Sequence, residues 1–133
     1  MFLLDTNIIS ELTKKQPSPR LLERLSLVPA TSLCTASVCI MELRFGALRV
    51  PNSEALWGKL QKRILSKLTV MNFAYKEAFK AAEVLAHLYS TGQPVGVEDV
   101  IIASIAMSNG LAIVTANTKH FSRIPGLTVE NWL

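Results

Sequence analysis

Three acidic residues in apolar surroundings are the strongest candidates for chemistry in this chain. Asp5 directly follows the apolar run Met1–Leu4, Glu42 lies inside an apolar helical pattern, and Asp99 begins the most apolar helical pattern. Carboxylates that meet in one site repel one another and raise each other's pKa, and a hard divalent cation relieves that repulsion. Oxygen ligands suit Mg²⁺ or Mn²⁺, either of which can activate water and stabilise charge on a phosphodiester. These residues therefore indicate a metal-dependent phosphodiesterase.

Each acid also has a structural interpretation that involves no chemistry. Asp5 suits the N-cap of a following helix. Glu42 could pair with Arg44 or a lysine at the surface, which is the commoner fate of a helical glutamate. Asp99 could favour the N-terminus of its helix through the helix dipole. From the residues alone both interpretations stay open, and the choice depends on whether the fold brings the three acids together.

Short apolar runs alternate with helical patterns along the chain. The predicted strands cover residues 1–4, 33–36, 69–73, 111–115 and 127–129. The predicted helices begin after Asp5 and at Ser18-Pro19, then cover residues 38–48, 53–68, 75–90 and 100–107, with a loop at 117–121. This alternation predicts an α/β fold, a three-layer α/β/α sandwich with a short, mostly parallel sheet. Ligands bind beyond the carboxyl ends of such strands, which is where Asp5 stands. No repeat or long linker interrupts the chain, so we expect one domain over residues 1–133.

The composition permits a polyanionic partner without requiring one. Lys and Arg exceed Asp and Glu by 14 to 10, which gives a net charge of +4. Charged residues make up only 18% of the chain, against about 25% in typical soluble domains. Either a partner covers part of the surface, or the domain has a large core. The basic run Lys59, Lys62, Arg63 and Lys67 is interpreted as a solvated helix face, with contact to RNA phosphates as the alternative.

The number of cysteines and the lengths of the apolar runs indicate the cellular compartment of the protein. Cys34 and Cys39 are too few for a disulfide framework and lack the spacing of a zinc site, so we expect small core side chains in a reduced protein. Asp5 interrupts the first apolar run before a signal-peptide core could form. No apolar stretch reaches the roughly 20 residues of a membrane span. We therefore expect a cytoplasmic protein without a membrane partner.

Several ordered segments resemble one protein family. They are Leu-Leu-Asp-Thr-Asn-Ile-Ile-Ser at 3–10, Met-Glu-Leu-Arg-Phe-Gly at 41–46, Gly-Gln-Pro-Val-Gly-Val-Glu-Asp-Val-Ile-Ile-Ala at 92–103 and Val-Thr-Ala-Asn-Thr-Lys-His-Phe at 114–121, followed by Ile-Pro-Gly-Leu at 124–127 and Glu-Asn-Trp at 130–132. In this order and spacing they resemble the PIN-domain family, and more narrowly the VapC-type toxins of bacterial toxin–antitoxin pairs. Each segment alone is a weak signal, but the ordered set spans nearly the full length.

The resemblance implies a PIN-like fold and a Mg²⁺- or Mn²⁺-dependent endoribonuclease. The metal-holding, catalytic acids of the family match Asp5, Glu42 and Asp99, with Thr6, Asn7, Thr115 and Asn117 as possible supporting residues. Family members often carry a fourth acid where Asn117 or His120 stands here. An Asn117 amide oxygen could still ligate a metal or hold a metal-bound water, and a protonated His120 could contact a phosphate. We expect one well-held metal, and a second only with RNA bound.

The resemblance also implies partners. VapC-type toxins usually form homodimers and are neutralised by a cognate VapB-type antitoxin, which wraps the toxin and often blocks the active site with a basic side chain. The complex commonly binds operator DNA through the antitoxin only. In this chain, the leucine-rich helices could form the dimer face and the antitoxin groove.

Two other functions compete with the nuclease. The missing fourth acid would fit a catalytically weak or inactive regulatory module that acts with its antitoxin as a DNA-binding repressor complex. A phosphatase with an aspartyl nucleophile ranks last, because Asn7 stands where that chemistry needs a second acid.

Overall fold

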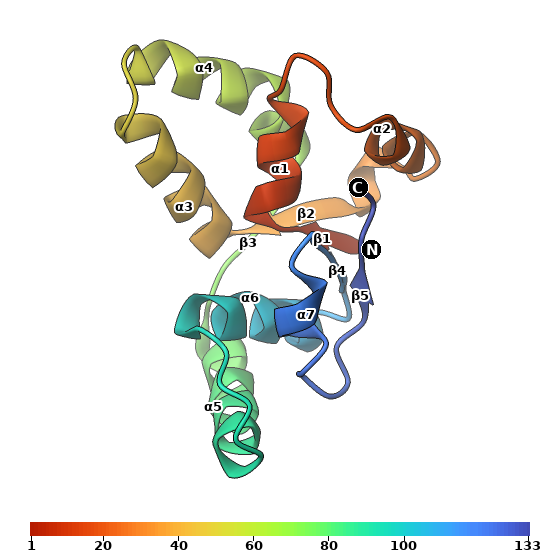
Figure 1. Cartoon of the computed structure of the whole chain (residues 1–133), viewed down its shortest axis with the longest axis vertical. Coiled ribbons are helices and arrows are strands. Elements are labelled where there is room, and N and C mark those ends of the chain that lie inside the picture. The colour runs from red at the N-terminus through yellow and green to blue at the C-terminus, as the bar shows by residue number, and fades with distance from the viewer.

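The computed structural model, which describes all 133 residues, contains one five-stranded sheet (Figure 1). Its strands are β1 (Phe2–Leu4), β2 (Leu33–Ala36), β3 (Thr69–Met71), β4 (Ala112–Val114) and β5 (Val129–Glu130). They lie in the order β3-β2-β1-β4-β5, and every neighbouring pair is parallel. The parallel arrangement puts the carboxyl ends of all five strands at one edge.

Helices cover both faces of this sheet, which confirms the three-layer prediction. In Figure 1 the first four helices lie on one side of the sheet and the last three on the other. The helices are α1 (Thr6–Leu12), α2 (Pro19–Ser26), α3 (Ser37–Leu48), α4 (Ser53–Arg63), α5 (Tyr75–Ser90), α6 (Val97–Ser108) and α7 (Thr118–Phe121), with single 3₁₀ turns η1 (Ala30–Ser32) and η2 (Leu65–Lys67).

The core is divided into two clusters by the central strand. Successive side chains of a strand point to opposite faces of a sheet. Leu3 accordingly packs in the cluster beneath α5 and α6, whereas Leu4 packs in the cluster beneath α1 and α4. Helix α6 is mostly apolar beyond its first turn, as expected of a helix buried in a core, and five of its hydrophobic residues have no solvent exposure: Val100, Ile102, Ala103, Ile105 and Ala106.

Most predicted elements are confirmed, and the deviations have local causes. Strand β2 and helix α5 have the predicted bounds. The long helix predicted over 53–68 ends at Arg63, because Ile64 leaves the helical region with φ −121° and ψ −62°. The predicted loop at 117–121 contains the one-turn helix α7, which places Phe121 fully in the core. A single turn is too short to show a periodic pattern, so no helix could be predicted there.

Both cysteines are free and buried, as predicted for small core side chains. Burial raises the pKa of each thiol to about 11. None of the helices combines the length and the apolar character that crossing a membrane requires.

Candidate active site

Asp5 is the first residue beyond the carboxyl end of the central strand β1. It is only 5% exposed. Its Oδ1 accepts the backbone N–H of Thr6 at 2.8 Å, so Asp5 is the N-cap of α1. Its Oδ2 accepts the hydroxyl of Thr115 at 2.7 Å and the side-chain amide of Asn7 at 3.2 Å. The capping interpretation is therefore correct, and the same contacts hold the carboxylate in one orientation at the sheet edge.

Further supporting contacts join Asn7 of α1 to the residues that follow the neighbouring strand β4. Leu4 pairs with Val114, so the residues that follow β1 and β4 meet at the sheet edge. The Thr115 hydroxyl oxygen accepts the Asn7 side-chain amide at 3.3 Å and the backbone N–H of Asn117 at 2.9 Å. The Asn7 amide oxygen in turn accepts the backbone N–H of Ala116 at 3.0 Å. These bonds place Asn7 and Thr115 around Asp5 as a fixed polar frame.

Glu42 reaches the same edge from α3. The hydroxyl of Thr6 donates to Glu42 Oε1 at 3.1 Å, so Thr6 bonds to Asp5 through its backbone and to Glu42 through its side chain. The alternative in which Glu42 pairs with Arg44 is wrong. Arg44 Nη2 instead donates to Glu54 at 2.9 Å.

Asp99 lies in the first turn of α6, where the helix dipole also favours its charge. Its side chain is 25% exposed, and its Oδ2 lies 3.4 Å from His120 Nδ1. The same ring nitrogen lies 3.1 Å from the side-chain nitrogen of Asn117. The two residues at the expected fourth acidic position are thus joined to Asp99 rather than to Asp5.

All three acids line one cleft of about 520 Å³. The other lining residues are Thr6, Asn7, Ser10, Glu11, Lys14, Asn117 and Leu133. The acids nevertheless do not converge on one point as expected, because no three His, Cys, Asp or Glu side chains lie close enough together to hold a metal ion. The fold brings the carboxylates to the same cleft and leaves space between them.

Sequence reasoning missed Ser10, Glu11 and Lys14 as cleft residues. Ser10 and Glu11 follow Thr6 and Asn7 by four residues and lie on the same face of α1, and Lys14 comes four residues after Ser10, just beyond the end of that helix. That spacing is visible in the sequence and could have identified them. Lys14 Nζ and the Glu11 carboxylate form an ion pair at 2.6 Å.

The carboxylates in and beside the cleft repel one another. Burial raises the pKa of Glu42, and repulsion from Asp5, Glu98 and Asp99 raises it further. The hydrogen bond from Thr6 lowers the pKa of Glu42 but does not cancel these effects. The pKa of Asp99 is raised by burial and by Asp5 and Glu98, while its contact with His120 acts in the opposite direction. Further negative charge is therefore disfavoured in the cleft, and a cation is favoured.

The donor chemistry fits Mg²⁺ or Mn²⁺. The available ligands are carboxylate oxygens and the Asn117 amide oxygen, which are hard donors. Mg²⁺ keeps several of its waters and usually takes only one or two carboxylates, so the separated acids suit it through bridging waters. Cys39 Sγ lies 3.8 Å from Asp5 Oδ1, but its thiol has a pKa of about 11 and stays protonated. A thiolate metal such as zinc does not fit.

Known proteins match the chain over nearly its full length. The PIN domain model matches residues 2–127. The tRNA(fMet)-specific endonuclease VapC of Salmonella typhimurium is 34% identical over 131 residues, covering 98% of this chain and 97% of the relative. Ribonuclease VapC2 of Haemophilus influenzae is 33% identical over 134 residues, covering 99% and 98%.

Solved structures of toxin–antitoxin complexes contain the same fold. VapBC2 of Rickettsia felis, bound to a DNA fragment from its promoter, matches with a TM-score of 0.90 at 32% identity, covering 99% of this chain and 98% of the other. DNA-bound VapBC of Salmonella typhimurium matches with a TM-score of 0.86 at 36% identity, with the same coverage. The chain therefore belongs to the PIN-domain family and, within it, to the VapC-type ribonucleases of toxin–antitoxin systems.

Proposed function

We propose that this protein is the toxin of a toxin–antitoxin pair and a Mg²⁺- or Mn²⁺-dependent endoribonuclease. Asp5, Glu42 and Asp99 are the proposed metal-holding and catalytic acids. The observation that carries the proposal is the single cleft that these three side chains line at the carboxyl edge of the sheet, in a chain that belongs to the VapC ribonucleases. The raised pKa values of Glu42 and Asp99 support it, because burial first and repulsion from neighbouring carboxylates second disfavour the negative charge there, which a bound cation would offset.

When bound, the metal would help to activate water and stabilise charge on the phosphodiester. The chain supplies the rest. Asp5 is fixed by Thr6, Asn7 and Thr115, so it presents its carboxylate without rearrangement. Glu42 is suited to accept the proton of the attacking water, because a raised pKa makes its carboxylate a stronger base. Water adds to the phosphorus, the bond to the 3′ oxygen breaks, and the products are a 5′-phosphate and a 3′-hydroxyl.

The proposed partners are a cognate VapB-type antitoxin, a second copy of this chain, and operator DNA, which the complex binds only through the antitoxin. The proposed location of the protein is the cytoplasm. The solved relatives support the antitoxin, because they are complexes with one. Met41, Phe45 and Leu48 support the homodimer, since they lie three or four residues apart on α3 and are 52%, 61% and 55% exposed. An exposed apolar stripe of this kind is typical of an interface.

The regulatory module without catalysis is the second candidate function. Asn117 and His120 favour it, because neither supplies the fourth carboxylate. Such a module would still bind an antitoxin, but it would not cleave RNA.

Cleavage of an end-labelled RNA separates the two functions. Initiator tRNA is the first substrate to test, because the Salmonella relative is named for it. With Mn²⁺ present we expect the wild-type chain to cleave and both Asp5→Asn and Asp99→Asn to lose about 100-fold or more in rate. Glu98→Gln is the matched control, since Glu98 neighbours Asp99 but is exposed and does not line the cleft. Metal-dependent cleavage that survives Asp5→Asn would defeat the nuclease assignment.

A further inference from the structure

The acidic cleft contains a fourth carboxylate, which the proposed metal site does not use. Glu11 lines the cleft from α1, together with Asp5, Glu42 and Asp99. An RNA strand that enters the cleft brings further negative charge with every phosphate. The phosphate that comes nearest to α1 therefore needs a positive partner of its own, because Glu11 would otherwise repel it.

Lys14 is the only basic residue that lines the cleft. It stands just beyond the end of α1, and its Nζ lies 2.6 Å from the Glu11 carboxylate. The Lys14 side chain is 64% exposed, and an ammonium has several N–H donors, so the contact with Glu11 leaves others free for an anion. Lys14 thus offsets the charge of Glu11 and offers donors to a phosphate at the same place.

Glu11 is itself held in one position. Its side chain is only 15% exposed, and its Oε1 accepts the backbone N–H of Ser18 at 3.0 Å. Ser18 is the N-cap of α2, so Glu11 is fixed to the start of that helix while its second carboxylate oxygen contacts Lys14. A lysine side chain that is already held in place loses less rotamer freedom when it binds an anion.

A purely structural role for Lys14 makes different predictions. A cation after the last turn of α1 favours the helix dipole, and an ion pair three residues apart slightly stabilises a helix. Lys15 also stands beyond the end of α1 and is exposed, but it does not line the cleft and forms no ion pair. The two lysines therefore differ in their relation to the cleft and to Glu11, and Lys15 is a matched control for Lys14.

We propose that Lys14 binds a backbone phosphate of the RNA beside the phosphate that is cleaved, and that Glu11 positions its ammonium for this contact. The inference rests on the proposed function, in which RNA is the substrate. It adds a residue that holds the strand rather than one that takes part in cleavage. Because every nucleotide carries a phosphate, Lys14 contributes affinity without reading the RNA sequence.

The salt dependence of RNA binding tests for this contact. Binding of fluorescein-labelled initiator tRNA to the full chain is measured by anisotropy over a series of KCl concentrations, without divalent cations, so that no strand is cleaved. Lys14→Gln should raise Kd about three- to fivefold and reduce the slope of log Kd against log salt by about 0.7, the value for one phosphate contact to a single strand. Lys15→Gln removes the same net charge and should change Kd by less than about twofold. Thermal melting of each variant confirms that it is folded.

Ethylation interference locates the phosphate that Lys14 contacts. Ethylation by ethylnitrosourea removes the charge of single phosphates in the tRNA, and the modified positions are compared between the protein-bound and the free fractions. With the wild type we expect a short set of phosphates at which ethylation excludes the tRNA from the bound fraction. Lys14→Gln should lose the interference at one position or at two neighbouring positions and keep the others, and Lys15→Gln should give the wild-type pattern.

The outcomes separate this proposal from the nuclease assignment. An unchanged slope and interference pattern in Lys14→Gln would overturn the proposal, and so would equal effects of Lys14→Gln and Lys15→Gln, which would indicate only a response to net charge. Absence of RNA binding by the wild type would overturn it together with the RNA substrate of the proposed function. Binding that depends on Lys14 in a chain that never cleaves RNA would support the phosphate contact and defeat only the nuclease assignment.

Discussion

The hydroxyl of Thr115 offers a sharp test of how Asp5 is held. Thr115 is fully buried, donates to the Asp5 carboxylate at 2.7 Å, and accepts the backbone N–H of Asn117 at 2.9 Å. Thr115→Val keeps the shape and removes both bonds, together with the longer one that the hydroxyl accepts from the Asn7 side-chain amide at 3.3 Å. A hydrogen bond to a charged group contributes about 1.5–3 kcal/mol, and the orphaned N–H adds to the loss. We expect the free energy of unfolding to fall by about 2–3 kcal/mol, and the Tm to fall by about 8–12 °C in a domain of this size.

Thr35 provides the matched control. It is also fully buried in the sheet, but its hydroxyl donates to the neutral backbone carbonyl of Leu4 at 2.9 Å. Thr35→Val should lower the free energy of unfolding by only about 1 kcal/mol, or about 4 °C in Tm. Thermal melts of the metal-free proteins measure both. RNA cleavage should fall about tenfold in Thr115→Val and stay near wild type in Thr35→Val. Equal Tm losses in the two variants, with full cleavage by Thr115→Val, would refute the reasoning.

Three further predictions concern acids. Glu42→Gln should raise the Tm of the metal-free protein at pH 7 by about 2 °C. Burial and repulsion raise the pKa of Glu42, so its charge destabilises the fold at any pH above that pKa. A lower Tm in the variant would contradict this. In the metal-free protein, Glu42 and Asp99 should lose their protons at pH values above the ordinary pKa values of their side chains, because burial and then repulsion disfavour their charge; an NMR titration of the carboxyl carbons measures this, and midpoints at or below the ordinary values would contradict it. Glu77 has a lowered pKa: burial acts to raise it, but its own backbone N–H and the N–H donors of Asn109 and Ala74 outweigh burial. The ionised form of Glu77 therefore stabilises the fold above pH 4.5, and this stabilisation is lost as the pH falls through the lowered pKa. Glu77→Gln should lower the free energy of unfolding most at neutral pH and progressively less in acid, as measured by urea melts.

The sequence predicted the sheet and the three acids that line the cleft because both depend on short-range patterns. Apolar runs define the strands, parallel strands end at one edge, and an acid that follows such a run must stand at that edge, as Asp5 does. Glu42 and Asp99 were identified by their apolar surroundings, and both line the predicted cleft.

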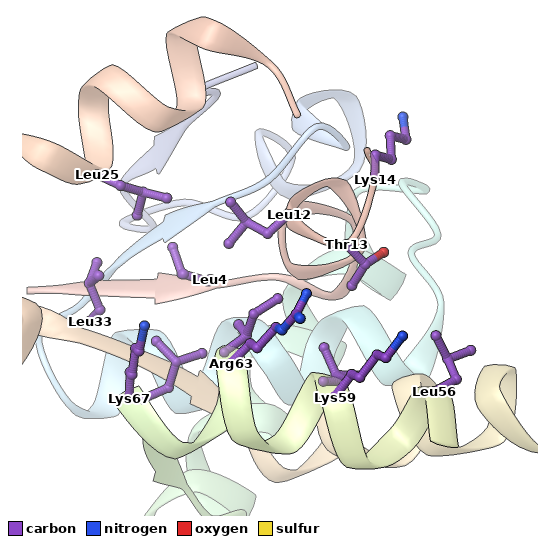
Figure 2. Close-up of a pocket in the computed structure, with 13 residues that line it drawn as sticks. Leu4, Leu12, Thr13, Lys14, Leu25, Leu33, Leu56, Lys59, Arg63 and Lys67 are labelled. Atoms are coloured by element: carbon purple, nitrogen blue, oxygen red, sulfur yellow. The ribbon is translucent and has the colours of Figure 1, made fainter. Parts of the chain in front are cut away.

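The remaining features depend on packing between distant segments. Thr6, rather than Arg44, bonds to Glu42 because α1 and α3 lie side by side, which no local pattern shows. An apolar hollow lined by Leu4, Leu25 and Leu56 is bordered by Lys59 and Arg63 (Figure 2), and because its walls come from elements far apart in the sequence, the basic run on α4 gave no sign of it. The spacing of the three acids, wider than one coordination sphere, likewise follows from the exact placement of α3 and α6 over the sheet.

Binding of Mn²⁺ to the purified chain, followed by the loss of the free-ion EPR signal, tests the central claim most directly. The claim is that Asp5, Glu42 and Asp99 act together on one divalent ion in the cleft that they line. It predicts one Mn²⁺ per chain for the wild type and for Glu98→Gln, and binding weakened about tenfold or more by each of Asp5→Asn, Glu42→Gln and Asp99→Asn. Mn²⁺ affinity that is unchanged in all three variants would contradict the account.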